Sequence, residues 1–182
     1  MHTQFTTSPL CCPSRASLLT GQYVHNHKTF NNSLEGGCNG LNWLNKIEMQ
    51  TLATTLEKVG YRNFFAGKYL NQYKGANVPP GWHEFYGLHG NSRYYNYTLR
   101  ENSHNVSYSN TYLTDLLGTK LIKFLNSPDI TMPFFALVAP PAPHAPYTPA
   151  ERHRNAYSGV KALRTPNFNK ISKGELKTCF II

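Results

Sequence analysis

The clearest hydrophobic pattern in the chain predicts an amphipathic helix over residues 113–125. Apolar side chains recur there at i, i+3, i+4, i+8, i+11 and i+12, which places them on one helical face. The pattern ends before Ser127-Pro128, because the residue that precedes a proline avoids the helical conformation. The apolar positions are Leu113, Leu116, Leu117, Leu121, Phe124 and Leu125.

A continuous apolar run follows at residues 134–139 and predicts a strand buried on both faces. The stretch 51–59 repeats leucine and valine at helical spacing before Gly60, and the aromatic-rich stretch 61–66 then predicts another strand. Strand, helix and buried strand in this order indicate a mostly parallel α/β sheet that is flanked by helices.

Less regular patterns occupy the rest of the chain. Pro13 and Ser14 form a helix-start signal, and the residues after them predict about two turns closed by Gly21. Residues 75–107 have no steady period and predict a long irregular connection with short pieces of structure. A proline-rich loop follows the last apolar run, at the strand end where open α/β sheets bind ligands, and His144 lies in it.

Composition favours a folded and positively charged protein. Apolar residues make up 40% of the chain and aromatic residues 13%, which excludes wholesale disorder. Lys and Arg number 18 against 9 acidic residues, and the net charge of +9 points to polyanionic partners such as nucleic acid, acidic lipid or sulfated sugar. The longest apolar stretch is too short for a membrane helix, and Met1 to Leu10 has no signal-peptide pattern.

Residues that bind metals or form disulfides are sparse. Only Asp115 and Asp129 are aspartates, so a carboxylate metal site is hard to assemble. The cysteines fit neither the spacing of zinc sites nor a dense disulfide framework, since two are adjacent and two remote: Cys11, Cys12, Cys38 and Cys179. Three glycosylation sequons suit a protein of the secretory pathway, with acceptors at Asn31, Asn96 and Asn105.

The segment from Pro9 to Gly21 carries the first chemical motif. It reads Pro-Leu-Cys-Cys-Pro-Ser-Arg-Ala-Ser-Leu-Leu-Thr-Gly and resembles, at every defined position, the type I sulfatase signature C-x-P-S-R followed by L-T-G. The resemblance implies that a formylglycine-generating enzyme oxidises Cys11 and that the resulting aldehyde hydrates to a geminal diol. It therefore implies a sulfate-ester hydrolase that uses formylglycine as its nucleophile.

A diol suits this chemistry better than a serine does. One hydroxyl attacks sulfur and expels the alcohol, and the second then expels sulfate as the aldehyde re-forms. We expect amide donors at the start of a helix beside Cys11 to favour an incoming sulfate. Arg15, one turn further on, has a guanidinium fork that can hold a diol oxygen or a sulfate oxygen.

The segment 60–70 resembles the second sulfatase signature, which makes Lys68 the expected sulfate-binding cation. Asn63 stands where the pattern usually has Ser or Thr, and Leu70 stands where many arylsulfatases have a histidine. Leucine there is a feature of the glucosamine-6-sulfatase branch. The chain resembles that branch and the extracellular heparan sulfate 6-O-endosulfatases over residues 1–169.

Histidines are judged by their place in these motifs. His144 resembles the family histidine that donates a hydrogen bond or proton to the leaving oxygen, which suits an imidazole. His25 and His27 could contact substrate or be solvated, and neither is assigned a role. An ordinary cysteine hydrolase built from Cys11 and His144 is disfavoured, because no local cysteine-hydrolase motif is present.

The resemblance also implies what should be missing. Sulfatases bind one Ca²⁺ through two aspartates before the first signature, an Asp-Asn pair far downstream, and the formylglycine, so only Cys11 would be a ligand here. We therefore expect residues 1–169 to be an internal part of a sulfatase catalytic domain, with an incomplete alkaline-phosphatase-like α/β fold. Open edges are expected, the chain alone should be inactive, and 170–182 is an unmatched, truncated or mis-spliced tail.

The leading function is hydrolysis of 6-O-sulfate esters on glucosamine in heparan or keratan sulfate, assigned to the full-length protein. Its partners would be a sulfated glycosaminoglycan and the formylglycine-generating enzyme, with no nucleic acid and no membrane span. The location would be lysosomal or extracellular. The alternative is a noncatalytic binder of sulfated glycans, in which the basic surface persists and Cys11 stays a thiol.

Overall fold

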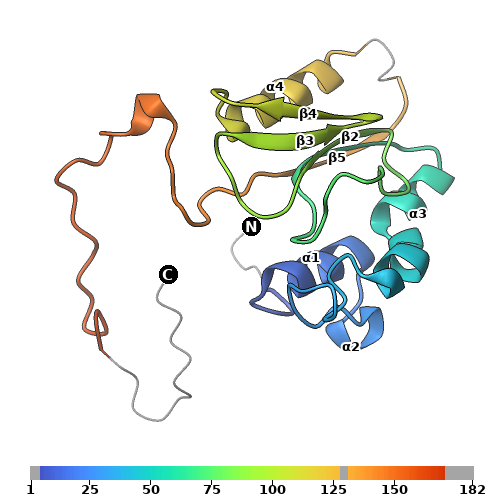
Figure 1. Cartoon of the computed structure of the whole chain (residues 1–182), viewed down its shortest axis with the longest axis horizontal. Helices are drawn as coiled ribbons and strands as arrows, with labels where there is room; N and C mark the ends of the chain where they lie inside the picture. The colour runs from blue at the N-terminus through green and yellow to red at the C-terminus, as the bar shows by residue number, and fades with distance from the viewer. Residues whose placement is uncertain (1–4, 128–130, 171–182) are drawn as a thin grey trace.

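The computed structural model describes residues 5–127 and 131–170. One sheet forms the middle layer, with α4 on one face and α1, α2 and α3 on the other (Figure 1). The expected α/β fold is confirmed. The unmatched tail that the sequence predicts from residue 170 lies, after Lys170, outside the described residues.

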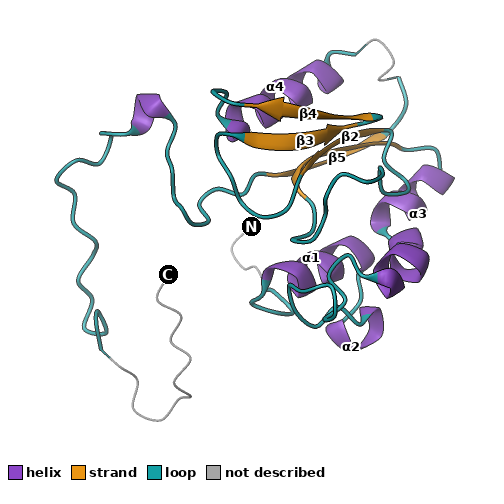
Figure 2. Cartoon of the chain, viewed as in Figure 1, coloured by secondary structure: helices purple, strands orange, loops and turns teal. Residues whose placement is uncertain are grey.

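The helices gather in the first third of the chain, four consecutive strands follow, and α4 then precedes the last strand (Figure 2). The helices are α1 (Cys11–Thr20), α2 (Val24–His27), the π-helix η1 (Trp43–Ile47), the 3-10 helix η2 (Glu48–Gln50), α3 (Leu52–Lys58), α4 (Leu113–Leu125) and the 3-10 helix η3 (Glu151–His153). The strands are β1 (Arg62–Lys68), β2 (Glu84–Leu88), β3 (Tyr97–Glu101), β4 (His104–Tyr108) and β5 (Phe134–Ala139). None of the helices in the described ranges is long and apolar enough to cross a membrane.

The five strands lie in the order β4-β3-β2-β1-β5. β1 pairs in parallel with both β2 and β5, whereas β3 is antiparallel to β2 and β4 is antiparallel to β3. Two successive reversals return β4 to the direction of β2, so only β3 runs against the other strands. The strands β2, β3 and nearly all of β4, which ends at Tyr108, lie in the region 75–107, where the sequence predicts only short pieces of structure.

The core consists of two apolar clusters, one on each face of the sheet. Phe65 packs with α1 and α3, while its neighbours Phe64 and Ala66 pack with α4. Successive side chains of a strand point to opposite faces, so one central strand supplies both clusters. β1 is accordingly buried along nearly its whole length.

β5 departs from the prediction of a fully buried strand. Its side chains do alternate between the two clusters, with Leu137 on one face and Val138 on the other. The strand is nevertheless only half-buried, and Phe134 is 41% exposed. The reason is position: β5 lies at the edge of the sheet, where β1 is its only partner among the described strands.

The helix boundaries follow their local signals closely. α4 begins and ends at the predicted residues, and α3 is capped by Thr51, whose side chain accepts a hydrogen bond from Thr54 N. α1 ends at Gly21, which has the left-handed φ of 67° that suits a C-terminal glycine. α1 begins at Cys11, before the predicted Pro13, and this puts the candidate nucleophile in the first turn.

Candidate functional site

The carboxyl ends of three parallel strands bring the predicted site residues to one edge of the sheet. β1 ends at Lys68, which pairs with Leu88 at the end of β2. Gly67 pairs with Ala139 at the end of β5. The segments that follow these strands, including the loop with His144, therefore leave the sheet from the same side as Lys68.

Gly67 allows the close approach of β1 and β5 at this edge. A Cβ on Gly67 would lie 2.1 Å from the carbonyl oxygen of Ala139, and its φ of +124° is one that other residues rarely adopt. The glycine before Lys68 in the second motif thus has a structural reason, because a side chain there would push the two strands apart.

The first turn of α1 lies against the end of β1. Arg15 Nη1 donates a hydrogen bond of 2.6 Å to the carbonyl oxygen of Lys68. Cys11 and Arg15 are half-buried, and they line a hollow of about 520 Å³ together with Val138 and Ala139 of β5. Residues far apart in the sequence therefore share one surface at the edge of the sheet.

The Lys68 ammonium is almost completely buried beside Cys11. The residue is 1% exposed, and its Nζ donates a hydrogen bond of 2.7 Å to Asn91 Oδ1. Burial lowers the pKa of Lys68. The neighbouring Cys11 side chain raises this pKa, and the positive charge of Arg15 lowers it. The Cys11 sulfur stands in for the diol oxygens of a formylglycine, so two cations face the atom that would carry the nucleophile.

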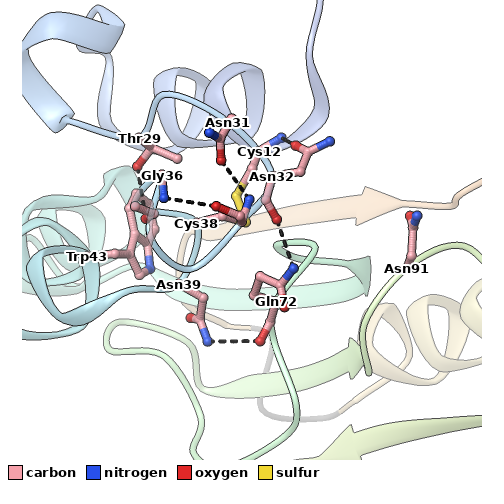
Figure 3. Close-up of a disulfide and its surroundings, with 12 residues drawn as sticks. Cys12, Thr29, Asn31, Asn32, Gly36, Cys38, Asn39, Trp43, Gln72 and Asn91 are labelled. Atoms are coloured by element: carbon pink, nitrogen blue, oxygen red, sulfur yellow. Dashed lines mark hydrogen bonds between the residues drawn. A yellow bond between two sulfur atoms is a disulfide. The ribbon is translucent and has the colours of Figure 1, made fainter.

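The residue after Cys11 is fixed by a disulfide that the sequence pattern did not reveal. Cys12 and Cys38 are bonded, and both are fully buried. Cys12 N–H donates to Asn32 Oδ1 at 2.9 Å, and Gln72 Nε2 donates to the Asn32 carbonyl at 2.9 Å (Figure 3). The loop around Asn32 therefore joins the start of α1 to the turn after β1.

These contacts correct one expectation about the helix start. Because Cys12 N–H already donates to Asn32, and Pro13 has no N–H, neither is available to an incoming sulfate. The positive charge that faces Cys11 comes mainly from Arg15 and Lys68. Burial lowers the pKa of Arg15, and Cys11 raises it.

His144 lies on the same side of the sheet but makes no recorded contact with Cys11, Arg15 or Lys68. It is exposed, and its Nδ1 lies 2.8 Å from the carbonyl oxygen of Ala145. A carbonyl only accepts, so Nδ1 carries a hydrogen and Nε2 is left to face other groups. The structure thus groups three of the four predicted catalytic residues and holds the fourth on a neighbouring loop.

Two site residues escaped the sequence analysis. Neither motif includes Asn91, and nothing in its local sequence indicates a contact with Lys68. Asn32 is the middle residue of a sequon, a pattern that hides its role in holding α1. Both contacts join segments that are remote in the sequence.

The comparison with known families agrees with this geometry. Residues 1–170 match the family model described as Sulfatase. The chain belongs to the sulfatase family. The family membership expected from the two motifs is therefore confirmed, and so is the expectation that this chain belongs to a family of enzymes.

The sulfatase relatives are considerably longer than this chain. It is 46% identical over 176 residues to the N-acetylglucosamine-6-sulfatases of Capra hircus and Homo sapiens, in alignments that cover 91% of the chain and 32% of each relative. It is 40% identical to the extracellular sulfatase SULF-1 homolog of Drosophila melanogaster, over 91% of the chain and 15% of that protein. The chain thus spans about a third of the N-acetylglucosamine-6-sulfatases it matches.

Solved structures give the same picture of a partial sulfatase fold. A complex with the substrate D-glucosamine-2-N,6-O-disulfate superposes with a TM-score of 0.79 at 25% identity, covering 97% of this chain and 33% of that one. A complex with k-i-k-neocarrahexaose superposes with a TM-score of 0.69 at 22% identity, over 86% of this chain and 40% of that one. The second likeness concerns the fold alone.

The two departures from the second sulfatase motif have structural roles here. Asn63 is fully buried, and its Nδ2 donates to the carbonyl oxygens of Ala53 and Gly81, each at 2.8 Å. It ties β1 to α3 and to the turn before β2. Leu70 is fully buried in the cluster on the α1 face. A leucine supplies no proton or ligand, so it contributes packing and no chemistry.

Among the described residues, no set of carboxylates matches the calcium ligands of the family. Within residues 5–127 and 131–170, no group of three or more His, Cys, Asp or Glu side chains is placed to hold a metal ion. Asp115 pairs with Arg152 on the surface, and Asp129 lies outside the described residues. The residues present do not form a calcium site, and no chemical step below depends on one.

The remaining predicted residues are placed as follows. The glycosylation acceptors Asn31, Asn96 and Asn105 are all exposed. His27 is fully buried, where it contacts Ser17 Oγ through Nε2 and accepts a hydrogen bond from Thr29 N–H, so its role is structural.

Proposed function

We propose that the full-length protein hydrolyses 6-O-sulfate esters of glucosamine in glycosaminoglycans such as heparan or keratan sulfate. The nucleophile would be a formylglycine made from Cys11. The observation that carries this proposal is the place of Cys11 in the first turn of α1, where it shares a hollow with Arg15 and neighbours the buried Lys68 ammonium. Residues 1–169 would form part of the catalytic domain.

The reaction divides into two steps at Cys11. Once the formylglycine-generating enzyme has converted Cys11 to the aldehyde, water adds to the aldehyde and gives a geminal diol. One diol oxygen attacks sulfur, and the bond from sulfur to the sugar oxygen breaks. The second diol hydroxyl then gives its proton to water, the bond from carbon to the sulfated oxygen breaks, and sulfate leaves as the aldehyde re-forms.

Each charged neighbour has a task in this scheme. Lys68 would hold the sulfate oxygens, whose charge moves to the leaving oxygen in the transition state. Arg15, which is anchored on the Lys68 carbonyl, would hold a diol oxygen and favour its ionised form. His144, in its doubly protonated form, would supply the Nε2 proton to the sugar oxygen and keep its Nδ1–H on the Ala145 carbonyl.

The substrate and cellular location are inferred from the relatives and from surface features. The relatives at 46% identity are named for N-acetylglucosamine 6-sulfate, and other relatives are named extracellular sulfatases. The buried Cys12–Cys38 disulfide and the exposed sequons suit an oxidising, glycosylating compartment. We therefore place the protein in the lysosome or outside the cell. Calcium would need ligands beyond the residues described here.

Mass spectrometry of the Cys11 peptide tests the proposal directly. The full-length protein is made with and without the formylglycine-generating enzyme, and activity is measured on a glucosamine 6-sulfate. We expect the aldehyde at Cys11, with Cys12 still in its disulfide, and activity only in the modified protein. Cys11→Ser should keep a stable sulfate ester or show no turnover, since serine has no second hydroxyl.

The result that would refute the mechanism is full sulfatase activity with a free thiol at Cys11. Binding of sulfated glycans by an inactive, unmodified protein would instead support the noncatalytic alternative. Normal multiple turnover by Cys11→Ser would also be incompatible with the diol scheme.

A further inference from the structure

Residues 89–96, the segment between β2 and β3, contact both Lys68 and the backbone of His144. The segment follows Leu88, which pairs with Lys68, so it leaves the sheet at the edge where the site lies. Its start is fixed, because Gly90 N–H donates a hydrogen bond of 2.6 Å to the carbonyl oxygen of Tyr73. A segment that is anchored here can hold its side chains in place against both Lys68 and His144.

The first contact of this segment is made by Asn91 on Lys68. Asn91 Oδ1 accepts from Lys68 Nζ at 2.7 Å, and Ser92 Oγ lies 3.4 Å from the same oxygen. The Cys11 side chain lies near enough to this ammonium to raise its pKa. A buried cation with a charge-assisted hydrogen bond has little freedom, so Asn91 limits where the ammonium can lie relative to Cys11.

The second contact is made by Tyr94 on the backbone of His144. Tyr94 is 3% exposed, its ring stacks on Tyr112 with 5.9 Å between centroids, and its carbonyl accepts a hydrogen bond of 2.9 Å from Leu113 N–H at the start of α4. From this anchored position the Tyr94 hydroxyl donates a hydrogen bond of 2.5 Å to the carbonyl oxygen of His144. The histidine is thereby tied to α4 through one side chain.

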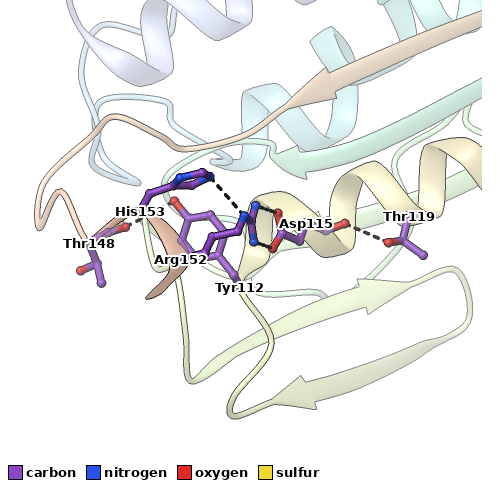
Figure 4. A network of polar contacts seen from close by, with 6 residues as sticks. All are labelled: Tyr112, Asp115, Thr119, Thr148, Arg152 and His153. Atoms are coloured by element: carbon purple, nitrogen blue, oxygen red, sulfur yellow. Dashed lines mark hydrogen bonds and ion pairs between the residues drawn. The ribbon is translucent and has the colours of Figure 1, made fainter. Parts of the chain in front are cut away.

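In the described part of the chain, further side-chain contacts join the loop to α4 and to the residue before it, beyond His144 (Figure 4). The Tyr112 hydroxyl donates to the carbonyl oxygen of Thr148 at 3.3 Å. Arg152 pairs with both carboxylate oxygens of Asp115, at 2.6 and 2.7 Å. These ties fasten the loop on α4 after His144, whereas the tyrosine of the 89–96 segment acts at the histidine itself.

We infer that residues 89–96 are the positioning segment of the site: Asn91 places the Lys68 ammonium at the sulfate, and Tyr94 places His144 at the leaving oxygen. Neither residue touches the reacting atoms, so both act through their partners. The inference rests on the proposed function. Its physical basis is preorganisation, because a displacement of about 1 Å in a catalytic group can lower a rate by about a hundredfold.

Two double-mutant cycles test the inference in the full-length, formylglycine-containing protein. On a glucosamine 6-sulfate, Tyr94→Phe should lower kcat about tenfold with little change in KM, because the ring and its packing remain. In a His144→Ala background the same substitution should change kcat by less than about twofold, since its effect passes through His144. In the second cycle, Asn91→Ala should lower kcat in the unsubstituted protein and should change kcat by less than about twofold in a Lys68→Ala background.

The matched control is Tyr97→Phe. Tyr97 is also 3% exposed, but its hydroxyl has no hydrogen-bond partner in the part of the chain that the structure describes. Its kcat should stay within about twofold of the unsubstituted protein. If Tyr94→Phe resembles Tyr97→Phe, or if its effect multiplies with that of His144→Ala, the assignment of Tyr94 is overturned.

The leaving group provides a second readout that does not depend on how much protein is folded. An aryl sulfate such as 4-nitrophenyl sulfate releases a stable phenolate and needs little proton donation. The ratio of kcat on the sugar sulfate to kcat on the aryl sulfate should therefore fall with Tyr94→Phe and stay constant with Asn91→Ala. A constant ratio for Tyr94→Phe would overturn its role, whereas absence of hydrolysis by the unsubstituted protein would overturn the proposed function itself.

Discussion

Removal of the Cys12–Cys38 disulfide should destabilise the chain by an amount that the structure lets us estimate. The two cysteines are 26 residues apart, and the loop they close contains most of α1 and all of α2. The loss of loop-closure entropy in the unfolded chain corresponds to about 3.5 kcal/mol for a loop of this length. For a chain of this size, that lowers the melting temperature by about 10 °C.

The assay is urea unfolding at pH 7, followed by the fluorescence of Trp43 and Trp82, which are both buried in the same cluster as Cys12 and Cys38. The double variant Cys12→Ala/Cys38→Ala is compared with a parent in which Cys11 and Cys179 are alanine, so that no other thiol can exchange. We choose alanine because a serine hydroxyl would be buried without a designed partner.

A reductant supplies the internal control. It should lower the free energy of unfolding of the parent to about that of the double variant, and it should leave the variant unchanged. If parent and variant unfold within about 0.5 kcal/mol of each other under oxidising conditions, packing and the Asn32 contact hold this loop, and the reasoning from loop closure fails.

Three further predictions follow from single residues. Lys68→Ala in the full-length protein should lower kcat/KM about a hundredfold, or about 3 kcal/mol, whereas Arg93→Ala should change only affinity and its salt dependence in steady-state kinetics at two salt concentrations. Gly67→Ala should lower the free energy of unfolding in urea by at least about 2 kcal/mol, because its Cβ would overlap β5. Gly118 has open space in α4, so Gly118→Ala should raise the free energy of unfolding by about 0.5 to 1 kcal/mol. Equal effects of the two substitutions would contradict the argument from close approach. Burial first, and then the charge of His25, lowers the pKa of His27 below its ordinary value of 6.5. Just below pH 6.5 the unfolded chain therefore binds more protons than the folded chain, and the free energy of unfolding should fall as the pH drops below about 6.5. His27→Gln should flatten this part of the curve of stability against pH.

Elements with strong local signals could be predicted from the sequence alone. The bounds of α4 match the apolar period and the Ser-Pro stop, because helix formation depends on contacts between residues three and four apart. The ends of α1 and α3 likewise match their glycines. The two motifs were sufficient to predict the sulfatase family and to name Cys11 and Lys68 as candidates.

Pairings between distant residues were decided only by the tertiary structure. The strands β2, β3 and β4 have short apolar patterns and become strands through hydrogen bonds with their neighbours in the sheet. The half-exposure of β5 follows from its place at the edge, which its apolar sequence does not encode.

The same distinction holds at the candidate site. Local sequence determines that Cys11 lies near the start of a helix and that a glycine precedes Lys68, but it carries no information on which remote groups meet them. The Cys12–Cys38 bond and the contact of Asn91 with Lys68 each span more than twenty residues. Such contacts form only once the sheet order has brought the chain segments together, because closing a loop costs entropy that no local pattern records.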